Sequence, residues 1–208
     1  MLEKLPDFVG HALRDQRAGL DQIVFNRLPL RNGHGTIAVT SGVFVDHGPL
    51  PVACTADGEG VSPPLHWSGV PAAATSVVLI VEDADSPTPH PLVHAIAVGL
   101  PVADGSLRGG ALADDEDAPP EATLGRNSYL QHGWLPPDPP PAHGPHRYAF
   151  QVFALGEGDG TAMPDAPGRD ALMDVLAARA IASGLLIGTY ERHDTTVDAA
   201  VPRGAASA

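Results

Sequence analysis

The sequence is poor in cysteine, in positive charge and in long apolar runs. Its single cysteine, Cys54, has no second thiol with which to form a disulfide inside the chain. Only 12 of the 208 residues are Lys or Arg against 25 Asp or Glu, which gives a formal net charge of −13. That charge would repel nucleic acids and anionic membrane surfaces at long range, so neither is an expected partner. No apolar run approaches the roughly 18 residues of a membrane span, so no span is predicted.

The rest of the composition is that of one domain rich in β-strands. A chain of 208 residues that is 43% hydrophobic can bury a sizeable core. Short apolar runs such as 37–39 and 43–45 are bounded by Gly, Pro and Asp, which is typical of an antiparallel β-sandwich. One C-terminal helix is predicted over 170–182, with Gly184 as its cap before a strand at 185–187. The predicted fold is therefore mainly β, an antiparallel β-sandwich with a C-terminal helix.

The two ends of the chain differ from its middle. Loosely helical spacing of apolar residues over 5–23 predicts an extra N-terminal amphipathic helix, which would cover the domain's own surface or form a homodimer contact. We divide the chain into an N-terminal helical extension at 1–35, one domain at 36–192 and a disordered tail at 193–208. The first residues carry charge and proline where a secretory signal needs an apolar core, so a cytoplasmic location is expected.

A polar pocket is predicted at the start of the strand 146–155. With a side-chain period of two, His146, Tyr148, Phe150 and Val152 point the same way, so the apolar face of the strand continues into an imidazole and a phenol. The connection before it is stiff, because its prolines fix φ.

Two further strands repeat this pattern. The apolar run 77–81 leads directly into Asp83 and Asp85, which Pro87 closes. In the strand 92–100, parity places His94 on the face formed by Leu92, Ile96, Val98 and Leu100. A buried core histidine or a simple turn would explain any one of these segments, but a single shared pocket explains all three.

Ordered motifs extend the comparison to a known family. Asp83 to Pro87 reads Asp-x-Asp-x-Pro, His94 follows, and residues 144–148 read Gly-x-His-Arg-Tyr. In this order they resemble the phosphatidylethanolamine-binding protein family, also called Raf kinase inhibitor-like proteins, and in particular its short bacterial branch. The resemblance covers residues 36–192. It departs from the family pattern at Ala84, Ser86 and Ala95 and at 136–140, where glycine and cysteine are missing, which changes the pocket wall.

The resemblance implies a binding protein and not an enzyme. Its ligand would be a phosphate-type anion or a phospholipid headgroup, and its partner a kinase or protease that it regulates. The family's ligand-binding positions fall here on Asp83, Asp85, Pro87, His94, Gly144, His146 and Tyr148. No cofactor and no metal are implied.

The residues themselves suggest how such a pocket would work. Two imidazoles and a phenol can donate hydrogen bonds to an oxyanion, while Asp83 and Asp85 would accept bonds from the histidines or from backbone amides and fix their tautomers. Two Asp and two His could instead bind a metal for phosphoester hydrolysis. Against that alternative, His-Glu-x-x-His and Gly-x-Ser-x-Gly motifs are absent. The acidic run 114–117 is predicted to be a solvated loop, with a cation site as the alternative.

Overall fold

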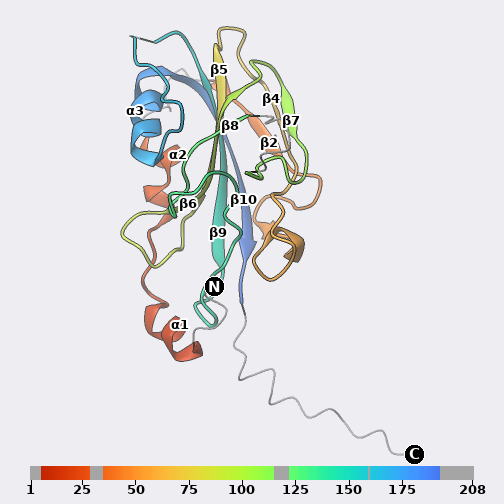
Figure 1. The fold of residues 1–208 in the computed structure, drawn as a ribbon, viewed down its shortest axis with the longest axis vertical. Coiled ribbons are helices and arrows are strands. Elements are labelled where there is room, and N and C mark those ends of the chain that lie inside the picture. Colours follow the sequence, from red (N-terminus) through yellow and green to blue (C-terminus); the bar gives the residue numbers. More distant parts are fainter. Residues whose placement is uncertain (1–5, 29–34, 115–121, 159, 193–208) are drawn as a thin grey trace, which may run out of the picture.

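The computed structural model describes residues 6–28, 35–114, 122–158 and 160–192 and consists of two β-sheets with three short helices (Figure 1). The strands are β1 (Gly35–Thr36), β2 (Ala38–Thr40), β3 (Gly48–Pro49), β4 (Leu65–Ser68), β5 (Ser76–Asp83), β6 (Leu92–Leu100), β7 (Gly105–Leu107), β8 (Thr123–Leu124), β9 (His146–Leu155) and β10 (Ala180–Tyr190). The helices are α1 (Asp7–Leu13), α2 (Val24–Arg27) and α3 (Arg169–Arg179), with 3₁₀ turns η2 (Leu20–Gln22) and η3 (Val52–Cys54). The mainly β class predicted from the sequence is confirmed.

The large sheet has the strand order β1-β10-β9-β5-β6-β8, and β3 also pairs with β10. Its four long neighbours, β10, β9, β5 and β6, are antiparallel, as predicted. The short strands β1 and β3 run parallel to β10, so the sheet is mixed. A second, antiparallel sheet has the order β2-β4-β7.

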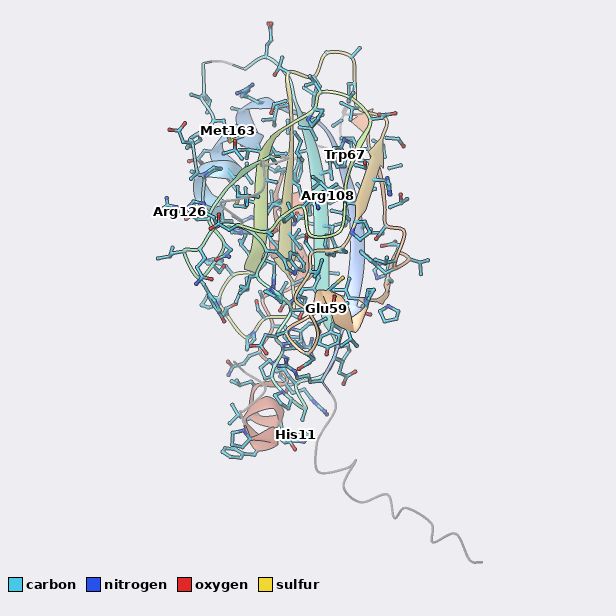
Figure 2. The ribbon with its side chains drawn as sticks, turned by 45° about the vertical axis from the view of Figure 1, so that its right-hand side comes forward. His11, Glu59, Trp67, Arg108, Arg126 and Met163 are labelled. Atoms are coloured by element: carbon cyan, nitrogen blue, oxygen red, sulfur yellow. The ribbon has the colours of Figure 1, made fainter. Side chains whose placement is uncertain are left out.

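The large sheet lies between the small sheet and the helices α2 and α3. One core cluster joins its inner face to Val39, Trp67 and Leu107 of the small sheet. The other cluster joins its opposite face to α2 and α3. Figure 2 shows the labelled Trp67 and Met163 on opposite sides of the central strands, in agreement with these clusters. Alternating side chains of β5 and β9 therefore contribute to two different cores.

Two local predictions are wrong. Residues 43–45 do not form a strand, although Phe44 is buried and its ring packs against that of Phe150 in a tilted arrangement. The C-terminal helix ends at Arg179, and Gly184 lies inside β10 instead of capping the helix. A Cβ at Gly184 would come within 2.2 Å of the Ile37 carbonyl oxygen, so this glycine allows two backbones to approach closely.

The continuous helix predicted over 5–23 is also wrong. The chain forms α1, leaves it after Leu13 and turns again only at η2 and α2. Between them, the amides of Ala18 and Gly19 donate to the carbonyl oxygens of Ser86 and Ala84. Hydrogen bonds to the rest of the domain thus replace the helical ones, and Gly19, at φ 99°, adopts a conformation that favours glycine.

Some predictions fall on residues that the structure does not describe, namely the tail 193–208 and residues 115–117 of the acidic run. Among the described helices, none has the length and apolarity that crossing a bilayer requires.

Candidate ligand-binding site

The polar ends of β5, β6 and β9 lie side by side because of the strand register. Asp83 pairs with Tyr148 across β5 and β9 and with Leu92 across β5 and β6. Next to them is a cavity of about 480 Å³, which Asp83, Pro87, His94 and His146 line together with residues 135–136 and 138–140. These four residues, which the sequence assigned to one pocket, therefore line the same cavity, and their role in binding a ligand stays a prediction.

The other three predicted site residues lie outside the lining. Tyr148 is directly behind it, fully buried, with its ring 5.1 Å from that of His94 in an edge-on arrangement and 6.4 Å from that of His146. Asp85 faces away and pairs with two arginines. Gly144 has φ 94° and lies beside the Arg17 guanidinium.

A β-bulge, which the sequence pattern did not reveal, turns His94 toward this cavity. Val81 pairs with Ala95 and Glu82 with Val93, so His94 is the extra residue between them. The bulge changes the parity of β6. Ile96 and Val98 point into the core beside α3, while the His94 ring contacts Tyr148 and Trp134 on the other face. The prediction that His94 shares a face with Ile96 and Val98 is wrong. His94 nevertheless lines the cavity.

His94 and Tyr148 present two unpartnered polar atoms at this place. His94 Nδ1 lies 2.6 Å from the Leu135 carbonyl oxygen, which only accepts, so Nδ1 carries a proton. Burial lowers the pKa of His94, which leaves Nε2 with a lone pair at neutral pH. Burial also raises the pKa of Tyr148 well above its usual value, so its hydroxyl keeps its proton. His94 Nε2 and the Tyr148 hydroxyl are the buried side-chain polar atoms without a hydrogen-bond partner in the described chain.

His146 has both of its ring nitrogens occupied. Its Nδ1 lies 2.7 Å from Asp83 Oδ2, a contact predicted from the sequence for one of the two carboxylates. Its Nε2 lies 2.7 Å from Nδ1 of His143, a fully buried residue that is not among the predicted site residues. The sequence feature that could have indicated this contact is the spacing of the two histidines, which lie three residues apart in a proline-rich segment. Of the three predicted donors, His94 and Tyr148 therefore each keep a polar atom without a protein partner, whereas His146 does not.

Asp85 holds the start of β9 in place. Its carboxylate accepts from the backbone amide and the guanidinium of Arg147 at 2.7–2.9 Å and lies 3.1 Å from the guanidinium of Arg17. Burial opposes ionisation of Asp85, but the hydrogen bonds from Arg147 and Arg17 outweigh it and lower its pKa. Asp85 thus acts through the backbone of the site and not on the cavity itself.

Changing Asp85 to Asn should lower the free energy of unfolding by about 1.5 kcal/mol at neutral pH, because charge-assisted bonds to partly exposed arginines are lost. A lowered carboxyl pKa stabilises the fold above the unfolded-state value of about 3.9, and this contribution disappears as the pH falls through the folded-state value. The difference from wild type should therefore vanish in acid. Urea unfolding at several pH values measures it, with the exposed Asp15 changed to Asn as control. A difference that does not depend on pH would contradict this assignment.

A second hollow of about 570 Å³ adjoins the first and shares Thr88, Leu92 and Tyr129 with it. Neither of the two unpartnered buried atoms belongs to its lining. In the part of the chain that the structure describes, no three His, Cys, Asp or Glu side chains are grouped as metal ligands. The first cavity is therefore the candidate site.

Comparison with known proteins agrees with this geometry. The family profile described as phosphatidylethanolamine-binding protein matches residues 40–191. A UPF0098 protein of Pyrococcus abyssi is 32% identical over 165 residues, covering 78% of this chain and 90% of the relative. The crystal structure of a homologue from Chlamydia trachomatis gives a TM-score of 0.66 at 32% identity, covering 76% of this chain and 98% of the other. The structure of YbcL from E. coli gives 0.67 at 28% identity, covering 74% and 98%.

Proposed function

The chain belongs to the phosphatidylethanolamine-binding protein family, and we propose that its cavity binds a small phosphate-type anion, free or as part of a lipid headgroup. The observation that carries this proposal is the pair of unpartnered buried atoms, His94 Nε2 and the Tyr148 hydroxyl, beside a cavity of about 480 Å³. A buried polar group without a partner costs about 1–3 kcal/mol. A ligand that satisfies both groups would recover that cost.

The two atoms have complementary needs. The Tyr148 hydroxyl donates, while the neutral His94 accepts at Nε2. A protonated phosphate oxygen can donate to His94 while another oxygen accepts from Tyr148, or His94 can take up the proton itself. In both cases, binding of the phosphate dianion is accompanied by the uptake of one proton from solution.

Affinity should be modest. Of the described residues that line the cavity, none is Lys or Arg, and the net charge of the chain is −13. Two hydrogen bonds of about 1.5–3 kcal/mol each oppose an association cost of roughly 4–15 kcal/mol. Most of the binding energy of a larger ligand would have to come from its apolar part.

The proton taken up on binding predicts the pH dependence. Because binding raises the pKa of the group that holds this proton, phosphate should bind most tightly in mild acid and progressively more weakly as the pH rises through the bound-state value. Calorimetric titration of inorganic phosphate between about pH 5.5 and 8 tests this. Affinity that does not change over this range would refute binding at His94.

The source of the phosphate is decided by parallel titrations with phosphoethanolamine and with vesicles of zwitterionic phosphatidylethanolamine. Tighter binding of the vesicles supports a lipid headgroup, and equal binding of inorganic phosphate and phosphoethanolamine supports a free anion.

Regulation of a kinase or protease and a cytoplasmic location stay predictions. Metal-dependent hydrolysis is not proposed, because Asp83 and Asp85 are both engaged by protein partners, and none of the relatives described above carries an enzyme's name.

A further inference from the structure

His143 connects the cavity wall to the N-terminal segment, residues 6–28. Its Nδ1 faces His146 Nε2 at 2.7 Å, and its Nε2 lies 2.8 Å from the carbonyl oxygen of Leu13. With the contact between His146 and Asp83, three hydrogen bonds run from a backbone carbonyl through two imidazoles to a carboxylate.

The number of protons in this chain of hydrogen bonds indicates the charge of His146. The Leu13 oxygen only accepts, so His143 carries its proton on Nε2, and its Nδ1 is then an acceptor for His146 Nε2–H. His146 needs a second proton at Nδ1 for the contact with Asp83. Three contacts require three protons, whereas two neutral imidazoles hold two. Asp83 also accepts from the Asp85 amide at 2.8 Å, which favours the ionised carboxylate and hence an imidazolium at His146.

The surroundings of His143 favour its neutral form. Burial lowers the pKa of His143, and the positive charge of His146 lowers it further, as does that of Arg17. Arg17 donates to the backbone oxygen of His143 at 2.9 Å and lies between it and Asp85. On the far side of His146, Asp83 is the charged group that faces it, and His94 lies beyond. The positive charge therefore rests on His146, next to its carboxylate.

The N-terminal segment fixes His143 in this position. Arg17 also donates to the Pro145 oxygen at 2.8 Å, and Gly10 lies so close to the Pro141 oxygen that a Cβ would be 1.8 Å from it. Figure 2 shows α1, which carries the labelled His11, at one end of the molecule. This segment precedes the residues matched by the family profile, which begin at position 40.

The backbone around His143 is held in an uncommon conformation. Ala142 has φ 60° and Gly144 has φ 94°. A non-glycine residue in the left-handed region persists only where its surroundings determine it. The hydrogen bonds to Leu13 and Arg17 supply that support.

We propose that His143 is a positioning residue: anchored by the N-terminal segment, it accepts the second hydrogen bond of His146 and so keeps a positive charge in the cavity wall. This inference goes beyond the proposed function, because the charge of His146 can be measured with the cavity empty. Only its consequence for phosphate affinity rests on the proposed function.

Two variants of the full chain separate the two contacts of His143. In His143→Asn, the amide oxygen can replace Nδ1 as acceptor for His146 but cannot reach Leu13. In His143→Gln, the amide nitrogen can replace Nε2 at Leu13 but leaves His146 without an acceptor. Ring-nitrogen chemical shifts by NMR, near neutral pH, report how many protons His146 carries, and thermal unfolding checks that each variant is folded.

Wild type and His143→Asn should show His146 with both ring nitrogens protonated, and His143→Gln should show it with one. A singly protonated His146 in the wild type would overturn the proposal without any variant, and equal protonation in both variants would overturn the role of His143. Phosphate should bind about tenfold more weakly to His143→Gln than to His143→Asn, as expected for the loss of one nearby charge. Absence of phosphate binding in all three proteins would count against the proposed function and leave the NMR result standing.

Discussion

Changing Arg169 to Met is expected to lower the free energy of unfolding by about 3–5 kcal/mol, because it leaves a buried carboxylate without its charged partner. Arg169 Nε lies 2.6 Å from Oε1 of Glu82, whose side chain is 0% exposed. Glu82 also accepts from the Val24 amide and from Gln151 Nε2 at 2.8 Å each. The pair thereby joins α2 and α3 to the centre of the large sheet, directly beside Asp83. Urea unfolding followed by circular dichroism measures the loss.

Two further variants test the cause of this loss. Adding Glu82→Gln to Arg169→Met removes the uncompensated charge, so the double variant should be more stable than Arg169→Met alone. Arg27, which donates to Gln22 on the exposed side of α2, serves as the matched control. Its change to Met should alter the free energy of unfolding by no more than about 0.5 kcal/mol. Equal effects of Arg169→Met and Arg27→Met would show that the buried pair does not stabilise the fold.

The sequence was sufficient to predict the strands that carry the site. Runs of apolar residues that end in Asp83 and that begin at His146 gave β5 and β9, and the ordered motifs gave their relation to a known family. These features depend on local pattern and on residue order, which a sequence shows directly. The parity of β9 was also correct, since Tyr148, Phe150 and Val152 share one core.

Features that depend on contacts between distant segments were not predictable in this way. The bulge at His94 arises from the register between β5 and β6, and no residue in β6 marks it. Gly184 has the same sequence context as a helix cap, and only the approach of Ile37 shows its actual role. The partners of Asp85 are Arg147 and Arg17, and both lie far from it in the sequence.

The roles of His143 and His146 also depend on contacts that the sequence does not show. From the sequence, every histidine near the predicted pocket was a possible donor to an anion. The structure shows that His146 has both nitrogens engaged inside the protein, while His94 has one without a partner. Burial alone does not separate these cases, because His94, His143 and His146 are all buried. What distinguishes them is whether a ring nitrogen lacks a hydrogen-bond partner, which is so for His94.

His94→Phe should therefore weaken phosphate binding ten- to hundredfold, which corresponds to the roughly 1.5–3 kcal/mol of a hydrogen bond to a charged group. Phenylalanine keeps the ring contacts with Tyr148 and Trp134 and removes both nitrogens. Since the proton taken up on binding lies in the contact between the phosphate and His94 Nε2, the remaining affinity should also lose most of its dependence on pH. Calorimetric titration of phosphate in mild acid and at neutral pH measures both effects.

The control for this experiment is His66→Phe, because His66 is exposed on β4 and belongs to no part of the cavity lining. It should bind phosphate like the wild type at every pH. Tyr148→Phe provides an independent comparison, since it removes the donor but leaves the acceptor at His94. It should weaken binding by a similar factor while keeping the pH dependence. If His94→Phe binds phosphate with unchanged affinity and unchanged pH dependence, the anion binds elsewhere, and the unpartnered atoms of His94 and Tyr148 do not form the recognition site.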